Sequence, residues 1–119
     1  MDRITFNETT PIVNGSNALW AISGATPTKI LVRRDYRGYA KIQVPNITAN
    51  AAAVGVWLLI TDKDATAVAA LMGTGKGIFV PVGGEFTMSA NELSPCAVWA
   101  LAYNSANAVT LCGVEAGQG

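Results

Sequence analysis

Short apolar segments recur along this chain between clusters of Gly, Pro, Asn and Asp, and this pattern limits the possible folds more than any other feature. About eight such segments are rich in Val, Ile and aromatic residues, which is typical of an all-β domain. They include KILVRR at 29–34, YAKIQV at 39–44, VGVWLLIT at 54–61 and GIFVPV at 77–82. Segment 54–61 is apolar at both alternating positions, which predicts a central strand covered on both faces. We therefore expect an antiparallel β-sandwich of the jelly-roll type.

Two segments compete between helix and loop. Residues 49–54 are rich in alanine, and residues 65–72 follow Asp64 as a possible helix cap and end before Gly73. Helices this short are marginal alone, so we expect them to decorate a sheet. We expect the last two apolar segments, 97–103 and 108–115, to form a closing hairpin.

The length of 119 residues suits one domain. Residues 1–27 include the turn-rich run 7–27, which has only the short apolar pairs Ile12–Val13 and Leu19–Trp20 as anchors. We expect this segment to form an extended N-terminal arm that reaches a neighbouring subunit or a capsid. Residues 28–119 then form the β-sandwich domain.

The chain contains no histidine, which removes most metal and acid–base sites. A serine or cysteine nucleophile paired with His and a His-ligated zinc are both excluded. Segment 73–77, GTGKG, resembles a phosphate loop but lacks the Gly five places before its Gly-Lys and the Ser or Thr after it. Asp62 and Asp64 resemble the start of a calcium loop, but Ala67 stands where that loop needs glycine. We expect no enzyme activity, no cofactor and no metal.

Eight basic residues balance eight acidic ones, and only 13% of the residues are charged. No global field therefore draws the protein to nucleic acid or to a membrane. Uncharged runs at 9–28, 42–61 and 93–114 are interrupted by Pro, Asn or Gly, which argues against membrane spans. The first residues lack the apolar core of a signal peptide, so we expect Cys96 and Cys112 to be reduced thiols.

Basic residues cluster at one place, where five of the eight fall within thirteen positions: Lys29, Arg33, Arg34, Arg37 and Lys41. Asp35 to Gly38 has the residue order of a type I turn, which predicts a basic hairpin with tyrosines near its tip. Arginine and tyrosine are enriched at protein interfaces. The candidate partner-interface residues are Arg33, Arg34, Tyr36, Arg37, Tyr39 and Lys41. A solvated surface hairpin and a nucleic-acid contact are the alternatives.

The order of segments over residues 37–115 resembles small β-sandwich proteins of tailed bacteriophage virions. The matching residues are Arg37, YAKIQVPN, VGVWLLI, MGTGKGIFVPVGGEFTM and AVWALAYNSANAVTLCGVE. The resemblance implies a structural protein of the virion that assembles in the host cytoplasm. Low charge and high apolar content suit a subunit that buries much of its surface against neighbours.

Within this class, the resemblance implies a capsid decoration (cement) protein at lattice junctions as the first expectation, with a homotrimer as its assembly state. The expected partner is a capsid or other virion protein. A tail, baseplate or fibre-associated subunit is the second expectation. A carbohydrate-binding module is the third, with Trp20, Trp57 or Trp99 as a stacking platform for sugar rings.

Overall fold

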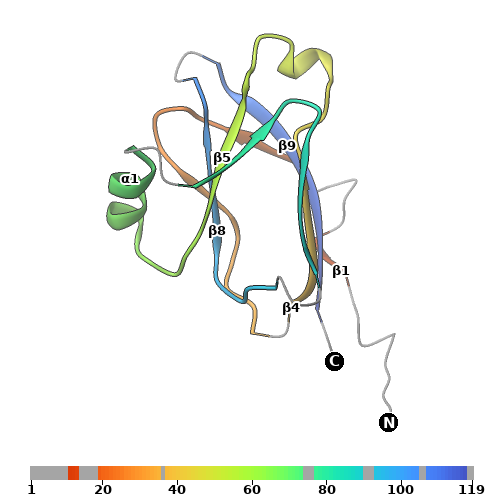
Figure 1. The fold of residues 1–119 in the computed structure, drawn as a ribbon, viewed down its shortest axis with the longest axis vertical. Helices are drawn as coiled ribbons and strands as arrows, with labels where there is room; N and C mark the ends of the chain where they lie inside the picture. Colours follow the sequence, from red (N-terminus) through yellow and green to blue (C-terminus); the bar gives the residue numbers. More distant parts are fainter. Residues whose placement is uncertain are drawn as a thin grey trace.

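The computed structural model describes residues 11–13, 19–35, 37–73, 77–89, 93–104 and 107–117. Over these residues, two antiparallel β-sheets pack face to face, and a short helix lies on the outer side of one of them (Figure 1). The all-β sandwich expected from the alternating apolar pattern is therefore confirmed.

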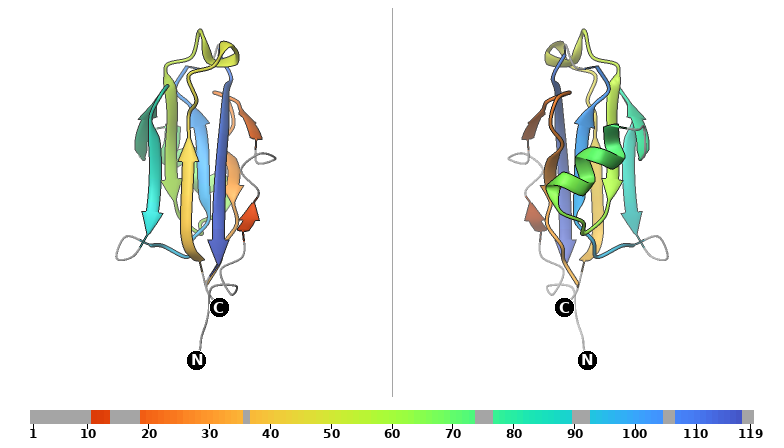
Figure 2. Two further views of the ribbon diagram at one scale, coloured as in Figure 1. Left: turned by 90° about the vertical axis from the view of Figure 1, so that its right-hand side faces the viewer. Right: turned by 90° about the vertical axis from the view of Figure 1, so that its left-hand side faces the viewer.

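The first sheet has the strand order β1-β9-β4-β7, and β2 also pairs with β9. Its strands are β1 (Pro11–Val13), β2 (Leu19–Ile22), β4 (Arg37–Gln43), β7 (Glu85–Ser89) and β9 (Val109–Gly117). The second sheet has the order β3-β8-β5-β6. Its strands are β3 (Thr28–Leu31), β5 (Gly55–Ile60), β6 (Ile78–Pro81) and β8 (Val98–Ala102). Figure 2 shows the two sheets one behind the other.

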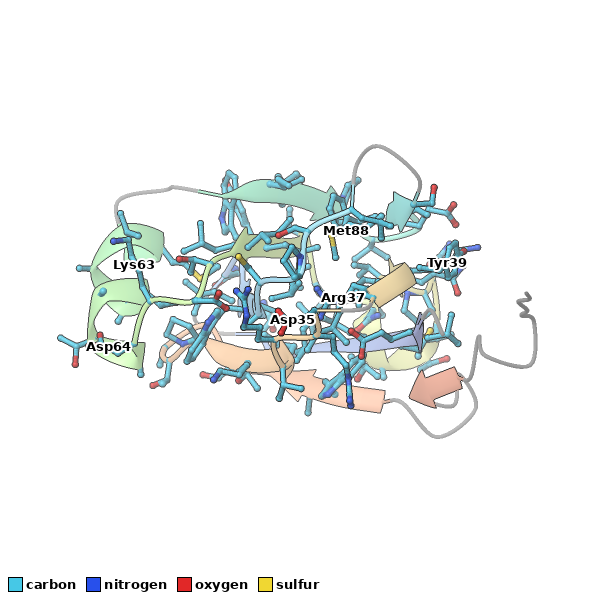
Figure 3. All side chains as sticks on the ribbon, turned by 90° about the horizontal axis from the view of Figure 1, so that it is seen from below. Asp35, Arg37, Tyr39, Lys63, Asp64 and Met88 are labelled. Carbon is cyan, nitrogen blue, oxygen red and sulfur yellow. The ribbon has the colours of Figure 1, made fainter. Side chains whose placement is uncertain are left out.

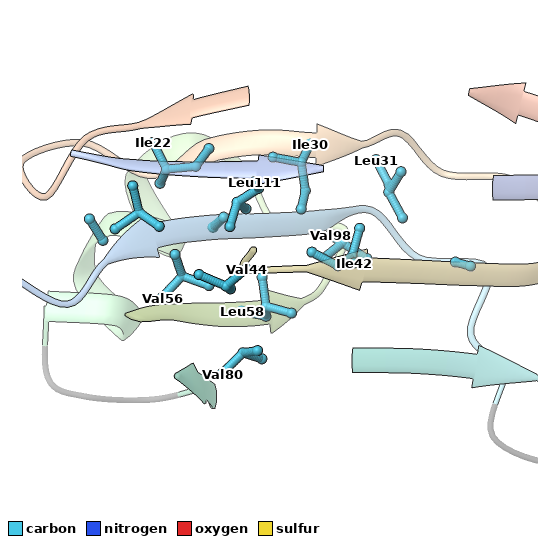
Figure 4. Close-up of a cluster of buried hydrophobic side chains, with 14 of the residues drawn as sticks. Ile22, Ile30, Leu31, Ile42, Val44, Val56, Leu58, Val80, Val98 and Leu111 are labelled. Carbon is cyan, nitrogen blue, oxygen red and sulfur yellow. The ribbon is translucent and has the colours of Figure 1, made fainter. Parts of the chain in front are cut away.

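The core lies between the sheets and is built by alternate residues of both. Because successive side chains of a strand point to opposite faces, most strands contribute alternate residues. Strand β3 instead contributes the consecutive Ile30 and Leu31, where its register with β8 shifts. The most completely buried of these side chains include Ile22, Ile42, Val56, Leu58, Val98 and Leu111, each at most 1% exposed (Figure 4). No charged side chain belongs to this cluster, so burial of apolar area stabilises it.

Strand β5 is covered on both faces, as its sequence predicts. Val56 and Leu58 point into the core. Trp57 and Leu59 pack on the outer face against a second buried cluster, which includes Val68 and Met72 of helix α1 (Ala65–Gly73). The carboxylate of Asp64 caps this helix by accepting a hydrogen bond of 2.9 Å from the Ala67 backbone N–H. The predicted helix at 65–72 is therefore confirmed. No helix in the described ranges has the length and apolar character needed to span a bilayer.

Both predicted hairpins are wrong, because their strands lie in different sheets. Strand β3 pairs with β8 in the second sheet, and β4 pairs with β7 and β9 in the first. Strands β8 and β9 likewise belong to opposite sheets. From β2 onward, every connection except that between β5 and β6 passes from one sheet to the other. An alternating pattern determines which face of a strand is buried, but it does not specify the neighbouring strand.

The N-terminal boundary also needs correction. Strand β2 pairs in register with β9, from Leu19 opposite Cys112 to Ile22 opposite Val109, and Ile22 is fully buried in the core. Strand β1 pairs with the other end of β9. Residues 19–22 are thus part of the sandwich domain and not of an arm. The remaining residues of the expected arm up to 18, apart from β1, lie outside the described residues.

The expected helix at 49–54 is reduced to a single 3-10 turn, η2 (Thr48–Asn50). Its last residue, Asn50, is 2% exposed and lies beside the end of β9. The Asn50 amide donates to the Pro45 and Thr110 carbonyls, at 2.8 and 3.0 Å, and its Oδ1 accepts from the Thr110 N–H at 2.8 Å. Pro45 has no N–H to continue the β4–β9 ladder, and the Asn50 side chain satisfies the backbone there instead.

Candidate docking surface

The residues of the basic cluster are engaged with other groups of the chain. The Nζ of Lys29 lies 5.2 Å from the centre of the Trp99 ring, and that of Lys41 lies 3.2 Å from the Glu85 carboxylate. Arg34 Nε lies 3.7 Å from the Glu115 carboxylate. The cluster therefore carries little uncompensated positive charge, which disfavours nucleic acid as its ligand.

Arg33 joins two acidic residues at one end of the sandwich. Its guanidinium donates to the carboxylates of Asp35 and Asp62, and about half of the side chain is exposed. The Asp62 carboxylate also accepts a 3.0 Å hydrogen bond from the Ala97 backbone N–H. Together with contacts from Cys96 and Arg33, this hydrogen bond lowers the pKa of Asp62 below its ordinary value of 3.8.

This shift gives a testable pH dependence. A carboxylate with a lowered pKa in the folded state stabilises the fold above its unfolded pKa, and that contribution is lost as pH falls through the folded pKa. We expect the free energy of unfolding to fall below about pH 4 and to fall less steeply in Asp62→Asn, which cannot titrate. Urea unfolding at a series of pH values measures this. Identical pH profiles for the two proteins would contradict the role of Asp62.

Arg37 is inside the protein, so its assignment to a partner interface is wrong. Its side chain is 1% exposed, and its Nε donates to the equally buried Glu115 carboxylate at 2.5 Å. The remaining donors reach the carbonyls of Ser94, Cys96 and Val32 at 2.6 to 2.8 Å. Figure 3 places Arg37 between the two sheets. A buried charge requires an ion partner and satisfied hydrogen bonds. Arg37 finds its ion partner on the first sheet and its carbonyl acceptors beside strands of the second, and it therefore connects the two sheets at this end.

Sequence reasoning missed Glu115 as the partner of Arg37, although one signal was present. Glu115 follows Leu111 and Gly113 on the inward-facing side of β9, where a charge needs a buried partner. Of the other predicted interface residues, Tyr39 and Lys41 face outward from β4, on the side away from α1, as Figure 3 shows for Tyr39. Tyr36 lies outside the described residues.

Three aromatic side chains of the described residues pack together on the outer face of the second sheet. Trp57 of β5, Phe79 of β6 and Tyr103, which follows β8, form what we call the aromatic surface. Ring centres are 5.2 Å apart for Trp57–Phe79, 6.2 Å for Trp57–Tyr103 and 5.5 Å for Phe79–Tyr103. Phe79 is 36% exposed and Tyr103 is 53% exposed. These rings hold each other in place and still present apolar area to solvent.

Gly55 allows the three rings to meet. A Cβ atom at this position would lie 2.4 Å from the Val80 carbonyl oxygen and 2.9 Å from the Phe79 ring. The Gly55 carbonyl accepts a hydrogen bond of 2.9 Å from the Tyr103 N–H, which fixes the chain as it leaves β8. The aromatic surface therefore depends on backbone contacts and does not rest on side-chain packing alone.

The segments that supply the aromatic surface lack charge. Residues 42–61, 77–84 and 93–114 contain no Asp, Glu, Lys or Arg. The cores of protein interfaces are depleted of charge and enriched in Trp, Tyr and Phe. An exposed apolar patch of this kind is typical of a surface that another molecule covers. Chemically, this surface can exclude water from a contact.

Two of the three tryptophans proposed as sugar platforms are unsuited to that role. Trp99 is 7% exposed beneath Lys29, and Trp20 packs against the core. Only Trp57 belongs to an exposed ring cluster, and its neighbours Phe79 and Tyr103 were not identified from the sequence. One sequence feature points to these rings: segments 54–61 and 77–82 are apolar at both alternating positions, whereas a strand with a single buried face needs apolar residues at only one of them.

Comparison with protein-family models, with curated proteins and with solved structures finds no match for this chain. Among the described side chains, no three His, Cys, Asp or Glu residues are grouped so that they could hold a metal ion.

Proposed function

We propose that this protein is a non-enzymatic structural subunit of a virion, a capsid decoration protein that docks at lattice junctions through the aromatic surface. The observation that carries the proposal is a cluster of three aromatic rings on an outer sheet face whose segments lack charge. Burial of such rings in an interface supplies a large share of the binding free energy. The resemblance of residues 37–115 to virion sandwiches indicates the capsid as the partner.

The strand order supports a jelly roll as the finer description of the fold. Strands β1 and β2 both pair with β9 and can be counted as one interrupted strand. Each sheet then has four strands, in the orders β2-β9-β4-β7 and β3-β8-β5-β6. The first and last strands are neighbours, and most connections cross between the sheets. A jelly roll has eight strands in two such sheets and recurs in viral capsid proteins. A trimeric assembly, implied by the resemblance, completes the proposal.

The test uses purified protein and empty capsids of its parent phage, with bound copies counted by electron microscopy and sedimentation. We expect Phe79→Ser with Tyr103→Ser to weaken binding by roughly 2 kcal/mol or more, because both rings lie in the centre of the contact. Thermal unfolding of the free variants verifies that the sandwich remains folded. Full binding by a folded double variant would contradict docking through the aromatic surface.

Arg34→Ala is the matched comparison, since Arg34 belongs to the basic cluster and its side chain is 42% exposed. Contact through Arg33 and Arg34 stays a prediction from the sequence. If the capsid contacts the aromatic surface, Arg34→Ala binds as the parent does. Loss of binding in Arg34→Ala, together with retention in the aromatic variant, would move the interface to the basic cluster.

A further inference from the structure

A groove of about 420 Å³ runs along the outer face of the first sheet, on the opposite side of the sandwich from the aromatic surface. It is lined by Tyr39, Lys41 and Gln43 of β4 and by Cys112, Gly113 and Val114 of β9. The strands that form it face the viewer in the left panel of Figure 2. We propose that this groove binds a neutral oligosaccharide.

The alternation of the two strands builds the groove. Tyr39, Lys41 and Gln43 are successive outward residues of β4, and they lie opposite residues 116, 114 and 112 of β9. On the β9 side, Cys112 and Val114 carry only small or aliphatic side chains and form the bottom of the groove. The longer side chains of β4 form its wall. Trp20 occupies the inner side near Gly113, where a Cβ would lie 3.3 Å from its ring and 2.6 Å from the Lys41 carbonyl oxygen.

The polar groups around the groove suit a ligand that both donates and accepts hydrogen bonds. Lys41 pairs with Glu85 of β7 at 3.2 Å, and Thr87 of β7 lies opposite Lys41 in the register. The Gln43 amide oxygen lies 3.8 Å from the Cys112 sulfur. The phenol, ammonium and amide groups of β4 thus line the groove, and the Glu85 carboxylate of β7 lies beside the ammonium group. Sugar hydroxyls can use donors and acceptors of both kinds.

The charges favour a neutral ligand. Lys41 and Glu85 are opposite in sign and compensate each other, so the groove has no net charge to attract a phosphate, a sulfate or a nucleic acid. The Tyr39 ring and Val114 add apolar area against which the C–H faces of a sugar ring can pack.

The backbone argues against a peptide as the ligand. An extended peptide usually binds by adding a strand to an open sheet edge, where unpaired N–H and C=O groups are available. Both strands that line the groove are interior: β4 lies between β9 and β7, and β9 lies between β4 and the edge formed by β1 and β2. Their backbone groups are used within the sheet, so recognition falls to side chains, as it does for an oligosaccharide.

The experiment titrates the full-length isotope-labelled protein with cellohexaose, xylohexaose and chitohexaose, one at a time, and follows backbone amide shifts by NMR. We expect saturable shifts with at least one of them, at a Kd near 1 mM, confined to β4, β7 and β9. Tyr39→Ala should weaken that binding about tenfold or more, and Tyr39→Phe should retain most of it, because the ring supplies the contact. A heparin hexasaccharide, which is anionic, should not bind.

Phe79→Ala is the control on the opposite face and should bind the sugar as the parent does. The proposal is overturned if none of the three neutral sugars gives saturable shifts up to about 10 mM, if Tyr39→Ala binds unchanged, or if the shifts fall on the aromatic surface. Tyr39→Ala is also expected to bind capsids normally. A failure of sugar binding therefore does not contradict docking through the aromatic surface, and a failure of capsid binding does not contradict sugar binding in the groove.

Discussion

Replacing Glu115 by Gln is expected to lower the free energy of unfolding by about 3 to 5 kcal/mol. The substitution keeps the shape of the side chain but leaves the Arg37 guanidinium, 1% exposed, without its counter-charge. Removing one partner of a buried pair leaves an uncompensated charge in a low-dielectric interior, which costs far more than the net value of the pair. Urea unfolding followed by tryptophan fluorescence measures the effect.

Glu85→Gln is the matched control, because Glu85 also pairs with a cation but is 51% exposed. Its expected cost is at most about 1 kcal/mol, the range for a surface ion pair. The double variant Arg37→Met with Glu115→Met should recover much of the loss, since no charge is left buried. Equal and small losses for Glu115→Gln and Glu85→Gln would show that Arg37 is accessible to water.

Asn50→Ala is expected to destabilise the fold by roughly 3 kcal/mol. The change removes three hydrogen bonds and leaves the Thr110 N–H and two carbonyls unsatisfied next to the core. Each buried polar group that loses its partner costs about 1 to 3 kcal/mol. Differential scanning calorimetry and urea unfolding report the loss.

Asn46→Ala tests the same loop without the buried contacts, because Asn46 is exposed. Surface changes of this kind are usually within about 0.5 kcal/mol, and we expect that result here. Asn50→Asp should destabilise the protein at least as much as Asn50→Ala, since it retains the acceptor but loses both donors and adds a buried charge. A stable Asn50→Asp would contradict the described hydrogen bonds.

The features that sequence reasoning predicts correctly are those carried by local patterns. The two-sided apolar character of 54–61 predicts the covered strand β5, and Asp64 with Gly73 delimits helix α1. The pairing of strands is not local. Segments 29–34 and 39–44 alternate as the strands of a hairpin would. The same alternation buries one face of each strand when consecutive strands lie in opposite sheets of a sandwich, so the pattern cannot distinguish the two arrangements.

The environment of Arg37 and the proposed docking surface cannot be predicted from local patterns for the same reason. Arg37 and Glu115 are separated by 78 positions, and only the fold shows that Arg37 serves the interior. The aromatic surface joins rings from three separate segments, at Trp57, Phe79 and Tyr103. The residue types of Tyr39 and Lys41 make them candidates in the sequence, whereas their common orientation on β4 follows from its register with β9.

The position of β9 determines when the chain can fold during its synthesis. This last strand pairs with β1, β2 and β4, so it joins the edge of the first sheet to the rest. A nascent chain that still holds residues 109–117 inside the ribosome lacks Val109, Leu111 and the counter-ion of Arg37. Contacts so distant in sequence also form slowly. The sandwich therefore completes its fold only once β9 has left the ribosome, and until then β1 and β2 lack the strand with which they pair.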